Sequence, residues 1–392
     1  MKDMKNRLRR CVETLSLKIG ERHLGSRGEA EAARYVAGEF ARLGYDAVCE
    51  EYPAPGWRYG RYRLSLAGGR RSFPCFPCFY SAAGRAEGKL LPMDLADVKR
   101  LPSLNVKGRI CFVRGAFKSV LDSNKLAERL ERLGAAALVI TSPFRDTFST
   151  KVVRTPKLRT LPVVTVSMLT ALEMAPHLDK SFSLFVQAKT FPHVSWNIVG
   201  RHRGNGTPEV VIGAHVDTAP GIPGAFDNAS GVAVVLEAAR QLRPKIRNRS
   251  VDFVAFSGEE LNCLGSKAYG RRHKSELKHI SWMGCVDAVG RHLTRPFVAV
   301  GRSAKVRAIV RNAVAGTDFH VTGFHRGSDN GFFHDHGIPN LWFYDRWEDG
   351  FLAIHSPKDA PEIMDWARLA ETAQMACEVF GRLLAASPAG RK

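Results

Sequence analysis

The feature that most constrains the fold is an alternation of short apolar stretches with amphipathic ones after residue 193. The apolar stretches at 209–214, 251–256 and 280–286 have the length of buried strands. The stretch 232–242, between the first two, instead carries apolar residues at helical spacing. Strands that alternate with helices usually form a parallel sheet covered on both faces. We therefore predict the α/β class, with a mixed, mostly parallel sheet and helices on both faces.

The middle of the chain has a different pattern of apolar and turn residues. Residues 57–192 contain short strand-like stretches with frequent turn residues, and they lack clustered acidic and histidine residues. Before them, Pro53, Pro55 and Gly56 are expected to end a preceding strand. The predicted organisation is residues 1–56 as the first part of the main domain, 57–192 as a strand-rich insert, and 193–392 as the main part with the functional site.

Histidine and carboxylate side chains gather where the predicted strands of the main part end. Most of them directly follow an apolar stretch, and the others lie in loops that precede a helix or follow a later strand. Ligands of open α/β sheets bind at the carboxyl ends of the strands, so we expect these side chains to lie close together. The candidate site residues are His215, Asp217, Asp227, Glu259, Glu260, Asp287 and His355.

These residue types suit a pair of metal ions. Imidazole and carboxylate groups form a nitrogen and oxygen ligand set typical of zinc, and also of manganese or cobalt. One carboxylate can bridge two ions, while a glutamate that binds no metal can take a proton from water. The tandem Glu259-Glu260 fits that division of roles. Asp217, two residues after His215, could accept the other N–H of the imidazole.

Each segment taken alone also has a simpler explanation. Asp227 or Asn228 could cap the helix that follows. Glu259-Glu260 could begin a solvated helix, and His355 could be an ordinary loop residue. Their joint occurrence at several strand ends is what favours a metal site.

With their flanking residues, these segments resemble the co-catalytic di-zinc aminopeptidase family, which includes relatives of glutamate carboxypeptidase and the transferrin receptor. The similarity is strongest over about residues 193–385, in GAHVDTAPGIPGAFDNASGVAVVLEAARQL, VDFVAFSGEELNCLGSKAY, GCVDAVG and IHSPKD. The stretch LKIGERHLGSRGEAEAARYVAGEFARLGYDA is similar to the usual opening of the family. The segment VKGRICFVRGAFKSVLDSNKLAERLERLGAAALVITS resembles the protease-associated domain often inserted there.

The resemblance implies a zinc metallopeptidase, namely an aminopeptidase that hydrolyses N-terminal peptide bonds with two zinc ions per chain. It implies that His215 and Asp287 hold one zinc ion. Glu260 and His355 would hold the other zinc ion, and Asp227 would bridge the two. Manganese or cobalt in place of zinc stays open.

The resemblance also implies roles for two residues that do not bind metal. Glu259 would be the general base, and Asp217 would orient His215. The family often has a tyrosine before the last histidine, which helps to stabilise the oxyanion, but this chain has Ile354. A family stretch that usually reads Ser-Asp-His is Ser-Asp-Asn at 328–330.

Other activities remain open on the same metal site. A carboxypeptidase, a dipeptidase or an amide deacylase would need the same ligands. A binding protein that keeps the fold without turnover is a further alternative, although the complete ligand set argues against it.

The charge of the chain bears on its partners. The sequence has 58 Lys and Arg against 38 Asp and Glu, a net charge of +20, which could attract polyanions or acidic substrates. The basic residues are dispersed and form no stripe interleaved with aromatic residues, so we expect a peptide or aminoacyl substrate and no nucleic acid. The sequence shows no membrane span and no secretory signal, and its eight cysteines are scattered, so we expect a cytoplasmic protein.

Overall fold

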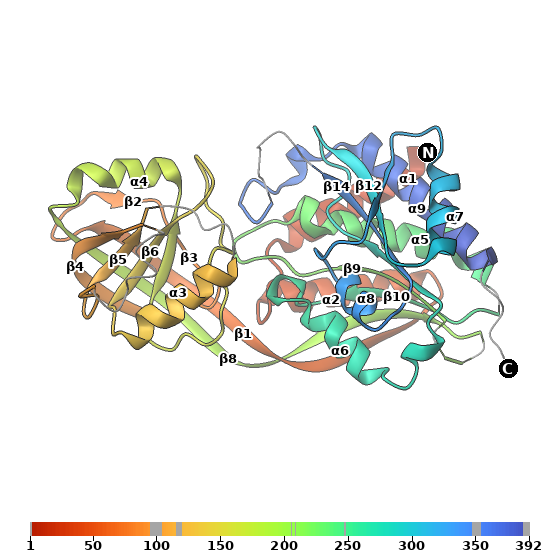
Figure 1. Cartoon of the computed structure of the whole chain (residues 1–392), viewed down its shortest axis with the longest axis horizontal. Coiled ribbons are helices and arrows are strands. Elements are labelled where there is room, and N and C mark those ends of the chain that lie inside the picture. The colour runs from red at the N-terminus through yellow and green to blue at the C-terminus, as the bar shows by residue number, and fades with distance from the viewer. Residues whose placement is uncertain are drawn as a thin grey trace.

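The computed structural model describes residues 2–94, 104–114, 120–204, 206–207, 209–246, 248–346 and 354–386. The chain forms two lobes, and the long strands β1 and β8 run from one lobe to the other (Figure 1). One lobe contains β2 to β7 with α3 and α4, and the other contains β9 to β14 with α1, α2 and α5 to α9 (Figure 1).

Fourteen strands of the described residues form one sheet, in the order β13-β12-β14-β11-β9-β10-β8-β4-β5-β6-β7-β3, with β1 paired to β8 and β2. Their bounds are β1 Asp46–Leu66, β2 Ser72–Phe73, β3 Phe76–Pro77, β4 Gly84–Met93, β5 Ile110–Val113, β6 Ala137–Thr141, β7 Val163–Val166, β8 Ser181–His202, β9 Val210–His215, β10 Val251–Phe256, β11 Trp282–Val286, β12 Arg295–Val300, β13 His320–Gly323 and β14 Asn340–Arg346.

The α-helices of the described residues are α1 Lys2–Glu13, α2 Arg27–Arg42, α3 Val120–Arg132, α4 Met168–Met174, α5 Ser230–Ile246, α6 Leu264–Arg272, α7 Ala304–Val314, α8 Asn330–Asp335 and α9 Trp366–Ala386. Short helical turns lie at Thr14–Ile19, Ala175–His177, Ala225–Ala229, Glu259–Leu261, Leu277–His279 and Pro361–Ile363. Within the described ranges, no helix combines the length and the apolar character needed to cross a bilayer.

The centre of the larger lobe is a parallel group of strands. β9 pairs in parallel with β10 and β11, and β11 pairs in parallel with β14. Every residue of β9, β10 and β11 is buried, as expected for strands covered on both faces. Side chains of α1, α2, α5, α7 and α9 join the core on one face, while α6 and α8 contribute to the core on the other. The predicted α/β class with a mixed, mostly parallel sheet is confirmed.

The expected break at Pro53, Pro55 and Gly56 is wrong. β1 continues through all three residues and stays paired with β8. The backbone N–H of Trp57 points away from β8 and donates to Leu24 O at 3.0 Å. Residues 53 and 55 lie on the same side of the strand as residue 57, so their backbone nitrogens also point away from β8. Proline at these positions therefore removes no hydrogen bond from the β1–β8 ladder, which is why the strand tolerates it.

The predicted domain boundaries fall inside these two strands. Gly56 pairs with Phe191 and Pro55 pairs with Pro192, so the boundaries after residues 56 and 192 lie opposite one another. The chain thus passes between the lobes within a continuous antiparallel ladder.

Candidate metal centre

The carboxyl ends of three neighbouring strands bring predicted site residues to one edge of the sheet. His215 is the last residue of β9, and Asp287 directly follows β11. Glu259 begins a helical turn just after β10. Before this turn, Gly258 has a φ of +76°, a conformation that a residue with a side chain rarely adopts. Because β9 runs parallel to both neighbours, these three side chains end at the same edge.

Asp227 and His355 reach the same edge from loops. Asp227 lies in the turn that precedes α5, and His355 lies between β14 and α9. Asp359 fixes the first loop, because its carboxylate accepts hydrogen bonds from the backbone N–H groups of Phe226 at 2.7 Å and Asp227 at 3.0 Å. Burial, together with the nearby charge of Asp227, raises the pKa of Asp359 to about 8. Sequence reasoning gave Asp359 no role, although it belongs to the quoted segment IHSPKD.

His215, Asp227 and Asp287 form a first group of ligand atoms. His215 Nε2 lies 2.9 Å from Asp227 Oδ1 and 3.2 Å from Asp287 Oδ1. None of the three residues is more than 5% exposed. Burial raises the pKa of the Asp287 carboxyl to about 6, although the nearby imidazole of His215 opposes that shift.

Asp227, Glu260 and His355 form a second group. His355 Nε2 lies 3.0 Å from Asp227 Oδ2 and 3.5 Å from Glu260 Oε2. Asp227 therefore presents one carboxylate oxygen to each group. In both groups the candidate ligand atoms lie within 4.8 Å of one another.

The donor chemistry of both groups fits a divalent cation. Each group offers one imidazole nitrogen and two carboxylate oxygens, which are ligand types that zinc binds in proteins. Glu260 Oε2 is buried, and the cation beside it in the structure is the Lys151 ammonium. Carboxylates buried this close together need a compensating positive charge. The five residues His215, Asp227, Glu260, Asp287 and His355 could thus hold a pair of metal ions.

Asp217 contacts both His215 and the backbone that carries the two glutamates. His215 Nδ1 lies 3.1 Å from the backbone oxygen of Asp217 and 3.5 Å from its Oδ1. The Asp217 carboxylate accepts hydrogen bonds from the backbone N–H groups of Glu259 and Glu260, each at 3.1 Å. The interaction with the glutamate backbone was not foreseen, because a sequence does not show which N–H groups a carboxylate will meet.

Glu259 lies beside both groups without joining either. It lines the same pocket as Asp227, Asp287 and His355, and it is 9% exposed. Cys263 Sγ donates a weak hydrogen bond to Glu259 Oε1 at 3.7 Å, while Oε2 faces the pocket side chain of Lys151 at 3.8 Å. Its position suits a proton acceptor next to the two groups of candidate ligands.

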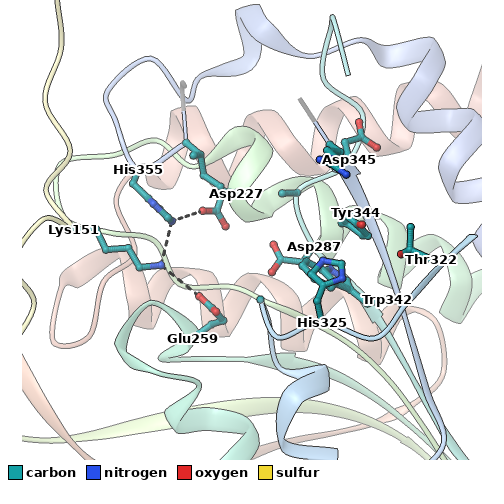
Figure 2. Close-up of a pocket in the computed structure, with 14 residues that line it drawn as sticks. Lys151, Asp227, Glu259, Asp287, Thr322, His325, Trp342, Tyr344, Asp345 and His355 are labelled. Atoms are coloured by element: carbon teal, nitrogen blue, oxygen red, sulfur yellow. Dashed lines mark hydrogen bonds and ion pairs between the residues drawn. The ribbon is translucent and has the colours of Figure 1, made fainter. Parts of the chain in front are cut away.

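The pocket has a volume of about 550 Å³ and two unlike walls (Figure 2). One wall carries the charged residues just described. The other includes Trp342 and Tyr344 of β14, whose rings stack at 4.4 Å, and His325, whose ring lies 4.8 Å from that of Trp342. Ile354, which stands where the family often has tyrosine, also lines this pocket.

Two buried cations near the site were not identified from the sequence. Arg22 donates hydrogen bonds to the backbone oxygens of Val216 at 2.8 Å and Gly224 at 3.0 Å, and so fixes the loop after β9. Lys151 comes from the smaller lobe and lines the pocket directly. Arg22 lies in the stretch that resembles the opening of the family, but nothing in that stretch indicates its contacts, and Lys151 lies outside the quoted segments. Only the fold shows that both residues lie near the site.

Comparison with known proteins supports a shared fold over almost the whole chain. Aminopeptidase YwaD of Bacillus subtilis is 27% identical over 385 residues, which cover 93% of this chain and 81% of YwaD. The crystal structure of BSAP, a zinc aminopeptidase from Bacillus subtilis, matches with a TM-score of 0.81 at 24% identity, covering 98% of this chain and 97% of that one. An aminopeptidase from Aneurinibacillus sp. strain AM-1 matches with a TM-score of 0.72 at 22% identity, covering 96% and 93%.

The family comparison covers the part of the chain that carries the site. Residues 197–380 match the profile of peptidase family M28. This range includes all seven candidate site residues and the strands that position them. Within residues 197–380 the chain is therefore similar to peptidase family M28, and it shares the fold of BSAP over almost its whole length.

Proposed function

We propose that this protein is a zinc-dependent aminopeptidase that hydrolyses the N-terminal peptide bond of peptides. The observation that carries the proposal is the position of Asp227, which presents one oxygen to each ligand group while Glu259 faces the same pocket. Similarity to a peptidase family and to proteins named aminopeptidases supports a peptide substrate with a free amino terminus.

In this proposal the five ligand residues hold two zinc ions. His215 and Asp287 would hold the first, Glu260 and His355 would hold the second, and Asp227 would offer one oxygen to each. Bound zinc would lower the pKa of water toward 7 and would polarise the scissile carbonyl group.

The side chains of the protein supply the rest of the chemistry. Glu259 Oε2 takes a proton from the attacking water and delivers it to the leaving amine. Asp217 keeps Glu259 in place through its hydrogen bond to the Glu259 backbone N–H. The wall formed by Trp342 and Tyr344 offers apolar surface to a substrate side chain.

We also propose that residues 57–192 form a protease-associated-like domain inserted between 1–56 and 193–392 of the peptidase domain. Two apolar clusters of the smaller lobe support this division, one around Leu138 and Ile140 and the other around Val139 and Phe182. A core of its own is what distinguishes a domain from a long loop.

The proposed activity is tested with a panel of peptides and a chelator. We expect hydrolysis of amino-acid anilides and of peptides with a free amino terminus, whether or not the carboxyl terminus is amidated. We expect no hydrolysis of the N-acetylated forms. Activity should vanish in 1,10-phenanthroline and return when zinc is added, because the metal supplies the activated water.

Each alternative activity gives a different result in this panel. Cleavage of N-acetylated peptides that stops when the carboxyl terminus is amidated would indicate a carboxypeptidase. Cleavage of dipeptides alone would indicate a dipeptidase, and release of the acyl group would indicate a deacylase. A protein that binds zinc but turns over no substrate would be a binding protein with this fold.

A further inference from the structure

Lys151 enters the catalytic pocket from the smaller lobe. It lies in the connection between β6 and β7, far in sequence from the metal ligands, and is 9% exposed. Figure 2 shows its side chain pointing toward His355 and Glu259 across the pocket. A buried ammonium group in an active-site pocket needs acceptors, and its acceptors here are side chains of the proposed metal site.

The ammonium contacts the ligand atoms of the second group. Lys151 Nζ lies 3.1 Å from His355 Nε2 and forms a close ion pair with Glu260 Oε2. It also lies 3.8 Å from Glu259 Oε2. His355 Nε2 must offer its lone pair to accept a hydrogen bond from the ammonium, and a metal ion needs the same lone pair.

We infer that the Lys151 ammonium and the second zinc ion are alternative occupants of one position. The inference rests on the ligand set proposed above. Zinc bonds histidine nitrogen and carboxylate oxygen at about 2.0–2.2 Å, so an ion held by His355 and Glu260 would overlap the volume that the ammonium fills. Repulsion between the two positive charges adds to this steric conflict.

The backbone around Lys151 is attached to the site, which keeps the ammonium close. The Arg154 guanidinium contacts the backbone oxygen of Glu260, and Lys358 Nζ pairs with Asp146 Oδ2 at 2.6 Å. The two contacts lie on either side of Lys151 in the sequence. Because the ammonium is tethered beside the site, it has a high effective concentration there, and a free zinc ion has to compete with that concentration for the same ligands. Binding of the second zinc ion therefore requires the lysine side chain to move away.

The first group is outside this competition. Lys151 pairs with Glu259 and Glu260, whereas His215 pairs with Asp217, Asp227 and Asp287. We therefore expect zinc to load in two steps, with tight binding at His215 and Asp287 and weaker binding at Glu260 and His355. If the ammonium holds the second position in about nine molecules of ten, the apparent Kd there rises about tenfold.

Zinc binding to metal-free protein tests the inference without relying on activity. We expect Lys151→Met to tighten binding of the second zinc ion by at least about tenfold, with the first unchanged, as measured by equilibrium dialysis and elemental analysis. Lys151→Arg keeps the positive charge and should keep the second site weak. Lys157→Met is the matched control, because its side chain is 76% exposed and pairs with Glu128 outside the pocket. Lys151→Gln provides a second neutral variant if Lys151→Met fails to fold, as judged by a cooperative thermal transition.

Failure of this inference can be told apart from failure of the proposed function. Two zinc ions per chain with the same second affinity in the wild type and Lys151→Met would overturn the competition and leave the metal site intact. If no variant bound zinc at all, the ligand set itself would be wrong, and the competition would fall with it.

Discussion

Replacing Glu259 with glutamine is expected to lower kcat by at least about 10²-fold, the smaller effect expected when a general base is lost. Glutamine has nearly the same size, but its amide cannot take up a proton at neutral pH. Because Glu259 belongs to neither ligand group, zinc content should stay close to that of the wild type. The measurement pairs steady-state kinetics on an amino-acid anilide with elemental analysis of the same sample.

Glu371→Gln on α9 is the control for this substitution, since the Glu371 side chain is 55% exposed and pairs only on the surface with Arg368. It should change neither turnover nor zinc content. Turnover near the wild-type value in the Glu259 variant would show that another group moves the proton. Loss of zinc from that variant would instead make Glu259 a ligand.

Replacing Asp227 with alanine is expected to remove both zinc ions and, with them, measurable activity. Its Oδ1 faces His215 and its Oδ2 faces His355, so the substitution takes one ligand from each group. The backbone N–H of residue 227 can still donate to Asp359, so the loop should be retained. Zinc at about 100 times its Kd stabilises a protein by about 2.7 kcal/mol. The wild type should therefore melt at a higher temperature when zinc is added, and the variant should not.

Asp318→Ala serves as the control for the loss of one carboxylate, because the Asp318 side chain is 77% exposed. It should keep the zinc content and the thermal shift of the wild type. An Asp227 variant that still carried two zinc ions per chain would contradict the bridging role. A single retained ion would assign Asp227 to one group alone.

The sequence predicts which candidate residues lie close together, because the sheet does most of the positioning. The strands β9, β10 and β11 are buried along their whole length, and their apolar sequences show this directly. Once these strands are placed in parallel, residues that follow them must meet at one edge. That is why His215, Glu259 and Asp287 could be grouped from the sequence alone.

The contacts that sequence reasoning missed are set by the path of the chain. Lys151 belongs to the smaller lobe, and His355 lies 204 positions away in the chain. The two meet because the connection between β6 and β7 packs against the larger lobe. Arg22 binds backbone oxygens, which every residue has and no pattern marks. The break wrongly expected at Pro53 and Pro55 has a similar origin, since a sequence does not show which side of a strand is unpaired.

Helix α1 has a helical spacing of apolar residues that its basic composition makes hard to see. Its sequence, KDMKNRLRRCVE, is strongly basic. Met4, Leu8, Cys11 and Val12 are nevertheless spaced so that they share one face, and all four are buried in the main core. Helical periodicity in a short charged segment is easily overlooked when apolar residues are few.

Anomalous X-ray diffraction at the zinc edge, from crystals grown with excess zinc, tests the central claim most directly. We predict two peaks about 3.5–4 Å apart on either side of Asp227. One should lie within bonding distance of His215 and Asp287, and the other within bonding distance of Glu260 and His355. Zinc bound elsewhere, or no peak beside Asp227, would contradict the account.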